Sequence, residues 1–124
     1  MVVVAIVAIL AMVALPAYTT YITKSRARSA ASDLVALSLN LENSFQKTLN
    51  YPVATTGTTN ETQSKMPGWM PTQSAYFTYS LVSTASPSAY TLTATGIGDM
   101  GCTLVLKSDN TRAATGASCG FSVW

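Results

Sequence analysis

Few side chains in this sequence could perform chemistry, and they do not form a catalytic set. The chain has no His, so it lacks the most usual general base and the commonest metal ligand. No Gly-rich phosphate-binding loop is present, and the few Lys residues are scattered. The carboxylates are too dispersed for a calcium loop: Asp33, Glu42, Glu61, Asp99 and Asp109. We expect a protein that is not an enzyme, with no catalytic residue, no metal and no cofactor.

Cys102 and Cys119 are the only cysteines. They are too far apart for a CxxC redox motif, and there is no second pair to complete a zinc site. Two interpretations remain: a pair of buried free thiols, or one disulfide made in an oxidising compartment. The membrane-type N-terminal stretch described next favours the disulfide. In the loop-closure description, a loop of this size contributes about 3 kcal/mol.

Residues 1–15 form a wholly apolar stretch that must be sheltered by something outside this small chain. As a helix it would be about 22 Å long, short of the roughly 20 residues that cross a bilayer. Every face would be apolar, so lipid or other protein must surround it. A cleaved signal peptide is disfavoured because no basic residue precedes the stretch and no loop follows it. A buried core helix is disfavoured because the remaining chain is too small to cover it.

The residues after this stretch mark the change from an apolar to a polar sequence. Pro16 predicts a kink or a melted turn, with a gentle bend as the alternative. Tyr18 and Tyr21 fall where amphipathic rings suit a membrane interface. A basic cluster follows, made of Lys24, Arg26 and Arg28. By the positive-inside rule this cluster would be cytoplasmic, which conflicts with a disulfide on the same side.

From residue 27 to residue 49 the apolar positions recur at steps of three and four, which predicts an amphipathic helix. Its apolar face comprises Ala27, Ala30, Ala31, Leu34, Leu37, Leu41, Phe45 and Thr48. Asp33 falls off this face. Pro52 ends the pattern, because proline disfavours helix at the residue before it. We therefore predict one helix, bent near Pro16, from residue 1 to about residue 50.

The rest of the chain predicts a small antiparallel sheet. Residues 51–75 are rich in turn residues and indicate a long irregular connection that contains Trp69, which we expect to be buried. Alternating apolar residues predict strands over 76–82, 90–95 and 102–106, with a short last strand at Phe121 and Val123. Helix and sheet should share one core, giving an α+β fold. The predicted core residues are Leu34, Leu37, Leu41, Phe45, Phe77, Tyr79, Leu92 and Leu104.

The N-terminal region resembles the helix of type IV pilins over residues 1–51, through the segment VVVAIVAILAMVALPAYTTYITKSRARSAASDL. Pilins share its apolar run, its proline, its aromatics and its amphipathic continuation. The strand region resembles them more loosely, and many pilins close a C-terminal loop with a disulfide. One feature departs: the methylated Phe and nearby Glu of the family, with its basic leader and Gly cleavage site, are absent. By alignment the sequence begins about six residues late, so neither residue is carried over. A basic leader would resolve the orientation conflict.

The resemblance implies a structural subunit of a type IV pilus, first held in the bacterial inner membrane and then in an extracellular filament. It implies homo-oligomers and other pilus subunits as partners, and adhesion, twitching motility or DNA uptake as the processes served. We expect residues 1–26 to protrude and residues 27–124 to form a head, with helix 27–50, loop 51–75 and a sheet with disulfide loop over 76–124. The expected filament-core residues are Val4, Ala5, Ile6, Ala8, Ile9, Ala11, Met12 and Leu15.

Three alternatives stay open. A type II secretion pseudopilin is disfavoured because no acidic calcium loop is seen. A DNA-binding minor pilin would need a basic stripe with aromatics, and Lys65, Lys107, Arg112 and Trp69 are too few to claim nucleic acid as a partner. The net charge of +2 gives a polyanion little attraction. The last alternative is a monomeric membrane-anchored module.

Overall fold

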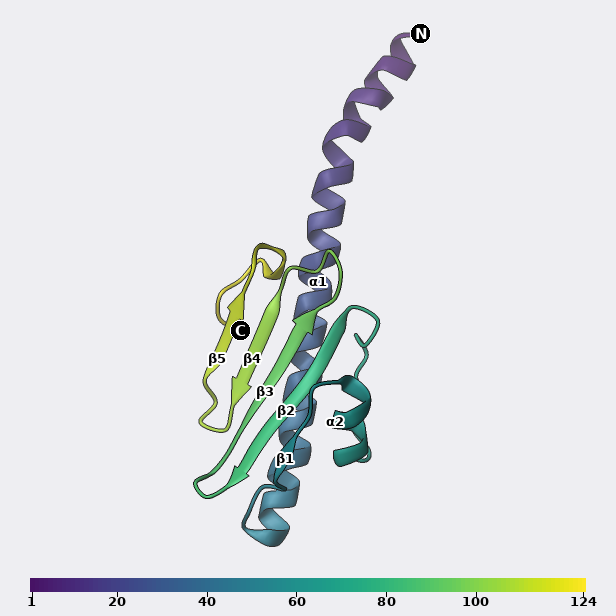
Figure 1. Ribbon diagram of the computed structural model, residues 1–124. Helices are drawn as coiled ribbons and strands as arrows, with labels where there is room; N and C mark the ends of the chain where they lie inside the picture. The colour runs from purple at the N-terminus through teal and green to yellow at the C-terminus, as the bar shows by residue number, and fades with distance from the viewer.

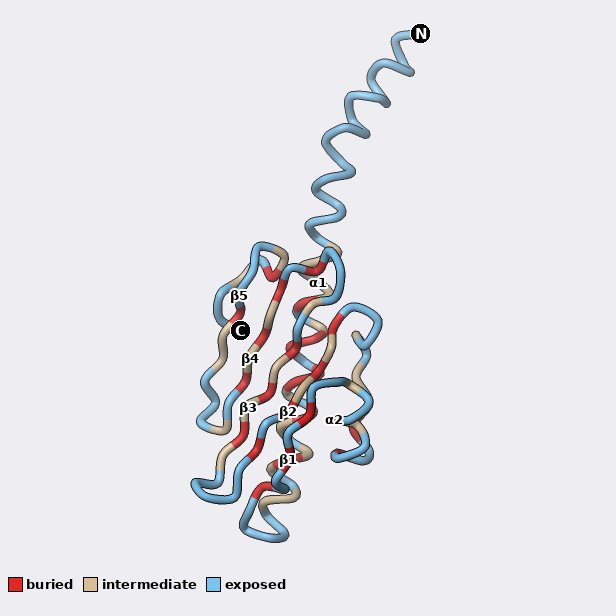
Figure 2. The backbone as a smooth tube through the Cα atoms, viewed as in Figure 1, coloured by how far each residue is buried: buried red, intermediate tan, exposed pale blue.

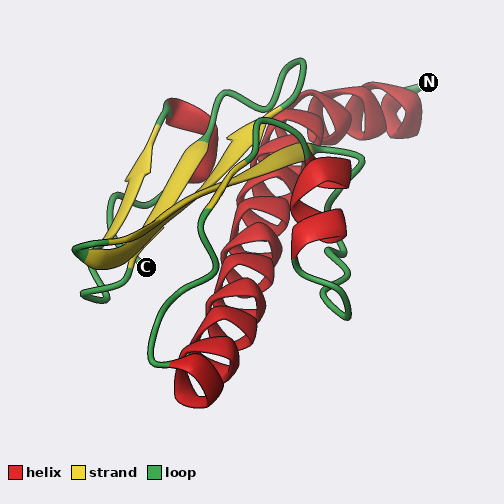
Figure 3. Ribbon diagram, turned by 60° about the horizontal axis from the view of Figure 1, so that its bottom comes forward, coloured by secondary structure: helices red, strands yellow, loops and turns green.

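A computed structural model describes residues 1–124. In chain order the elements are α1 (Val2–Thr48), β1 (Ala54–Thr55), α2 (Thr59–Lys65), β2 (Phe77–Ala85), β3 (Ser88–Gly96), β4 (Thr103–Lys107), β5 (Arg112–Thr115) and the 3₁₀ turn η1 (Ala117–Cys119). The strands form one antiparallel sheet in the order β1-β2-β3-β4-β5. One half of α1 lies along a single face of this sheet and the other half projects beyond it (Figures 1 and 3). The predicted α+β fold is confirmed.

Helix α1 is unbroken from Val2 to Thr48, although Pro16 lies inside it. Figure 1 shows that it curves gently, so α1 follows the gentle-bend alternative and has no melted turn at the proline. The helix ends where Leu49 adopts a left-handed conformation with φ 58°. The N–H of Leu49 then donates to the Phe45 carbonyl at 2.7 Å, which satisfies one of the last free carbonyls of the helix.

The core lies between the second half of α1 and the inner face of the sheet. No residue before Ala27 is buried (Figure 2). Of the predicted helix–sheet core, seven side chains are completely buried: Leu34, Leu37, Leu41, Phe77, Tyr79, Leu92 and Leu104. The eighth, Phe45, packs at the rim of the core and is only partly buried. Trp69 is buried, as its size predicts.

Asp33 is buried, although its sequence position places it off the apolar face. It is only 5% exposed. Its carboxylate accepts hydrogen bonds from the backbone N–H groups of Thr72 and Gln73 at 3.0 Å, and from the hydroxyls of Thr72 at 3.0 Å and Tyr79 at 2.5 Å. Its backbone carbonyl accepts the Trp69 indole N–H at 2.9 Å. These neutral donors compensate the buried charge and fasten α1 to the segment before β2 and to β2 itself.

Glu42 makes a second polar link, farther along α1. Its Oε1 atom accepts the hydroxyls of Tyr51 at 2.8 Å and Tyr90 at 3.1 Å. The ring of Tyr51 packs between those of Phe45 and Tyr90, with both centroid distances at 4.8 Å. Burial and the bond to Glu42 raise the pKa of Tyr51 to about 12. Burial and the Glu42 carboxylate also raise the pKa of Tyr90, just as burial and the Asp33 carboxylate raise that of Tyr79.

Residues 51–75 are not the irregular connection that their composition predicts, because they contain β1 and α2. The start of α2 is a capping box. The Thr58 hydroxyl accepts the N–H of Glu61 at 3.3 Å, and the Glu61 carboxylate accepts the N–H of Thr58 at 3.2 Å. Bonds from the backbone N–H groups of Gly57 and Thr58 lower the pKa of Glu61. The T-x-x-E spacing was the sequence signal for this helix, and the abundance of threonine and glycine obscured it.

Threonine hydroxyls form hydrogen bonds with the backbone groups of β2 that the two-residue strand β1 is too short to reach. The hydroxyl of Thr56 accepts the Leu81 N–H at 2.9 Å, and that of Thr59 accepts the Tyr79 N–H at 3.0 Å. The buried Thr62 hydroxyl donates to the Tyr79 carbonyl at 3.0 Å. An open strand edge is a template for pairing with another chain. Here hydroxyl groups take the place of the missing strand.

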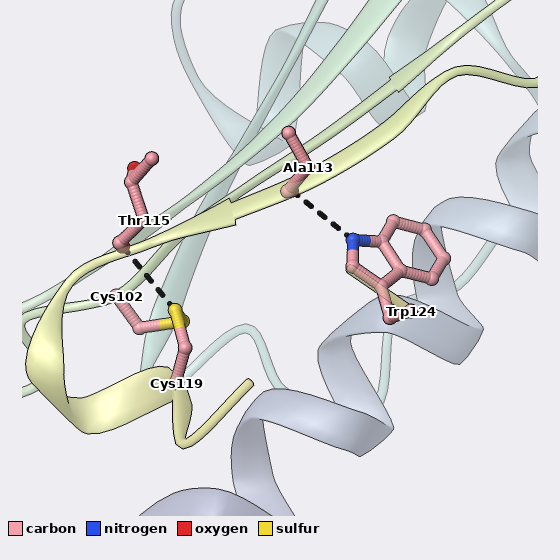
Figure 4. The surroundings of a disulfide bond; sticks show 5 residues. All are labelled: Cys102, Ala113, Thr115, Cys119 and Trp124. Carbon is pink, nitrogen blue, oxygen red and sulfur yellow. Dashed lines mark hydrogen bonds between the residues drawn. A yellow bond between two sulfur atoms is a disulfide. The ribbon is translucent and has the colours of Figure 1, made fainter. Parts of the chain in front are cut away.

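The last strand is β5, and the predicted strand at Phe121 and Val123 is wrong. This tail lies beside β5, but its main chain makes a single bond, from the N–H of Ala114 to the Ser122 carbonyl at 2.8 Å. The Trp124 indole N–H adds a bond to the Ala113 carbonyl at 3.2 Å (Figure 4). The sequence Arg-Ala-Ala-Thr of β5 has no alternation of large apolar residues, so periodicity could not identify it.

Replacing Asp33 by Asn should destabilise the fold by about 2–4 kcal/mol, because an amide NH₂ group would face donors where the carboxylate now accepts. The measurement is thermal or urea unfolding of the full chain in mild detergent, followed by near-UV circular dichroism. Asp99→Asn is the matched control on an exposed turn and should change stability by less than about 0.5 kcal/mol. Equal effects of the two substitutions would contradict this role of Asp33.

Stability should fall as the pH rises above 10, because the folded state holds the Tyr51 proton to a pKa of about 12 while the unfolded chain releases it near 10. This contribution is complete below pH 10 and is lost as the pH passes through 12. Unfolding temperatures measured from pH 8 upwards should therefore fall less steeply for Tyr51→Phe than for the unchanged chain. Tyr18→Phe, at an exposed tyrosine, should leave the slope unchanged; parallel curves for all three proteins would refute the prediction.

Candidate functional site

The N-terminal part of α1 is a bare apolar surface. Residues 1–21 are all exposed, and α1 contains a window long and apolar enough to cross a membrane, none of which is buried. Figure 2 shows this part of the helix free of the sheet. All the predicted filament-core residues lie there with exposed side chains: Val4, Ala5, Ile6, Ala8, Ile9, Ala11, Met12 and Leu15.

The threonines beyond the proline bond back to their own helix and so extend its apolar length. The hydroxyls of Thr19 and Thr20 donate to the Pro16 carbonyl at 2.9 and 3.0 Å, and the Thr23 hydroxyl donates to the carbonyls of Thr19 and Thr20 at 3.2 and 3.0 Å. Hydroxyls bonded in this way do not require water. Residues 2–23 then span about 33 Å, against about 30 Å for the hydrocarbon core of a bilayer. The sequence-based length of 22 Å counted only the residues before the proline.

The basic cluster on α1 divides into two parts. The guanidinium of Arg26 lies 3.7 Å from the ring centroid of Tyr76, so it belongs to the joint between helix and head. Lys24 and Arg28 instead line a shallow hollow on α1 together with Tyr21 and Ser25. The two predicted interface tyrosines, Tyr18 and Tyr21, are both exposed.

A second group of cationic and aromatic side chains lies where β4 turns into β5, over residues 107–112, which we call the β4–β5 turn. Lys107 ends β4 and is exposed. Arg112 begins β5, and its guanidinium donates to the Asn110 side-chain oxygen at 3.2 and 3.0 Å while lying 5.0 Å from the ring centroid of Trp124. These contacts hold the Arg112 fork in one orientation. Lys65, at the end of α2, is far from this turn along the order of the sheet.

The β4–β5 turn is held by its own hydrogen bonds. Asn110 has a left-handed conformation with φ 63°, and its N–H donates to the Lys107 carbonyl at 2.9 Å. The Asp109 carboxylate accepts the N–H of Thr111 at 2.9 Å, and hydrogen bonds from the side chain and backbone of Thr111 lower the pKa of Asp109. The negative charge of this turn is therefore tied to its own backbone, while Lys107 faces solvent.

No other element covers the sheet face away from α1 (Figure 3). The outward-facing residues of its strands are rich in hydroxyl groups. One row of directly paired residues crosses four strands and consists of threonine alone: Thr78, Thr95, Thr103 and Thr115. Farther along the same face, Thr91 pairs with Lys107. Hydroxyl groups both donate and accept hydrogen bonds, so this face can contact phosphate and sugar groups without distinguishing a sequence.

The disulfide predicted for Cys102 and Cys119 is confirmed. It joins the residue before β4 to η1, and Figure 4 shows η1 beside α1. Gly116, at φ 111°, is required just before η1, because a Cβ atom there would come within 2.0 Å of the Gly101 carbonyl oxygen. The head therefore ends in a covalently closed loop packed on the helix. No group of three or more His, Cys, Asp or Glu side chains in the chain could hold a metal ion.

A long helix with a bare apolar half, an antiparallel sheet packed on its other half and a C-terminal disulfide define a type IV pilin, a class of non-enzymatic subunits. Residues 16–119 match the family described as "Type IV minor pilin ComP, DNA uptake sequence receptor", and the chain belongs to this family. No curated protein and no solved structure matches the sequence significantly.

This match supports some of the sequence-based predictions of function more than others. The pilin identification is confirmed, whereas adhesion and twitching motility gain nothing from the family description. The alternative of a DNA-binding minor pilin is favoured over the main prediction. The count of basic residues gave too little support to DNA binding, because Arg112, Asn110 and Trp124 form one group only in the folded chain.

Proposed function

We propose that this chain is a minor pilin that binds DNA for uptake while it is part of a type IV pilus. The observation that carries this proposal is the family match, whose description names a receptor for DNA uptake sequences. The proposal assigns residues 1–26 to the inner membrane and then the filament core, and residues 27–124 to a head outside the cell. Other pilins of the same filament are its partners.

Assembly would use the bare half of α1. Helices of neighbouring pilins and lipid tails are about equally apolar, so the exchange of one for the other depends on close packing rather than on removal from water. Alanines at three-residue steps allow such close approach: Ala5, Ala8, Ala11 and Ala14. A nearly balanced exchange suits a filament that is both built and dismantled.

DNA contact would use the β4–β5 turn, where Lys107 lies with Thr91 on the outer, hydroxyl-rich sheet face and Arg112, paired with Leu106, lies at the edge of the opposite face. Lys107 is suited to a phosphate, and the Arg112 guanidinium can read a guanine edge when it exchanges its bonds to the Asn110 side-chain oxygen for that contact. A net charge of +2 supports only a few phosphate contacts, so non-specific binding should be weak and easily reversed by salt. A receptor that must recognise one sequence amid much other DNA benefits from this low background.

Enlarging two alanines of the apolar helix, Ala8→Leu with Ala11→Leu, should lower incorporation into pili several-fold while membrane insertion persists, because the helices could no longer approach closely. The measurement is mass spectrometry of sheared fibres and of membranes. Val3→Leu with Val7→Leu adds apolar volume where side chains are already large and serves as the control. Unchanged incorporation of the alanine double variant would contradict packing through this face.

DNA binding is tested by anisotropy with a duplex library that contains a randomised central segment, over a range of salt concentrations. Lys107→Gln should weaken binding of all sequences and reduce the salt slope by about 1. Arg112→Gln should cost an enriched sequence about 1–3 kcal/mol and flatten the preference.

Lys65→Gln removes the same charge from α2 and is the control for both variants. No binding by the unchanged chain at low salt would overturn the proposed function. Equal losses for Lys65→Gln and Lys107→Gln would move the contact away from the β4–β5 turn.

A further inference from the structure

We propose that the hollow on α1 formed by Tyr21, Lys24, Ser25 and Arg28 binds the phosphate headgroup of an anionic phospholipid, in the leaflet that faces the head. This binding is separate from DNA recognition and concerns the subunit while it is in the membrane. The β4–β5 turn has no part in it.

The hollow brings together positive charges and hydrogen-bond donors, which are the groups that bind a phosphate diester. Its residues are spaced at three, four and seven positions along α1, so their side chains lie on one side of the helix. Lys24 and Arg28 provide two positive charges one turn apart, and the hydroxyls of Tyr21 and Ser25 provide neutral donors.

The hollow also lies at the right depth. The hydroxyls of Thr19, Thr20 and Thr23 are bonded within the helix, so after the interface hydroxyls of Tyr18 and Tyr21 the first side-chain charge is that of Lys24. Side chains of a helix lean toward its N-terminus, which directs Lys24 and Arg28 back to the headgroup layer. Tyr21 stands one turn nearer the membrane, where tyrosines favour the interface.

The head contacts the stem of Lys24 and leaves the charges of the hollow free. The Lys24 stem lies against Gly120, where an added Cβ would come within 2.9–3.1 Å of three Lys24 carbons. Arg26, which lies between Lys24 and Arg28 in the sequence, is held over the ring of Tyr76 instead. The carboxylate nearest in sequence, that of Asp33, is enclosed by hydrogen bonds to the head. Because the hollow continues the bare apolar helix, a lipid is a better occupant than a separate acidic protein or a nucleic acid.

The test compares acetylation of individual lysines by a water-soluble ester, with the full chain in nanodiscs of phosphatidylcholine alone or with about one third phosphatidylglycerol. Peptide mass spectrometry gives the rate at each lysine. Phosphatidylglycerol should slow the reaction at Lys24 about fivefold, the effect expected for one basic side chain near an anionic surface. The rates at Lys47, Lys65 and Lys107 should stay within twofold, and they are internal controls in the same molecule.

Arg28→Gln should reduce the protection of Lys24 to less than twofold, whereas Lys65→Gln should leave it intact, and both should leave the unfolding temperature and DNA binding unchanged. Equal Lys24 rates in the two lipids would overturn the proposal. Equal protection by inorganic phosphate in phosphatidylcholine nanodiscs would overturn the assignment to lipid. Protection of Lys24 by a DNA duplex would give this surface to nucleic acid instead.

Discussion

The buried carboxylate of Asp33 fixes how the head is mounted on its helix. Apolar contact is non-directional, so the leucines of α1 alone would allow the sheet to rotate or slide along the helix. Asp33 accepts bonds from Thr72, Gln73 and Tyr79, and its carbonyl accepts one from Trp69, so a single helical residue is tied to the segment before β2 and to β2. A buried charge is tolerated only when its bonds are made, and in this protein they are made in one register.

A fixed mounting keeps two surfaces apart along one molecule. The apolar half of α1 leaves the head at one end, and its border with the head is marked by Lys24 and Arg28. The β4–β5 turn lies on strands at the edge of the sheet and does not contact that helix half (Figure 1). The proposed DNA contact and the proposed assembly surface therefore share no residue.

The parts with strong periodicity could be predicted from the sequence, and those built from tertiary contacts could not. The helix, three strands and the cysteine pair follow from local pattern and composition. Asp33 could not be identified as buried, because its partners lie about forty positions away along the chain. The candidate DNA surface could not be predicted for the same reason, since Arg112 and Trp124 come into contact only after the tail folds back on β5. Helix α2 does have a local sequence signal, the capping box that begins at Thr58, although the turn-rich composition around it predicts an irregular segment.

The closed edges of the sheet have a consequence for what the subunits can do when crowded together. Threonine hydroxyls occupy the edge of β2, and the C-terminal tail shields that of β5. These bonds reduce the unpaired backbone that strand exchange or cross-β stacking between molecules requires. At the high local density of a fibre, these bonds lower the tendency of neighbouring heads to pair through their strands.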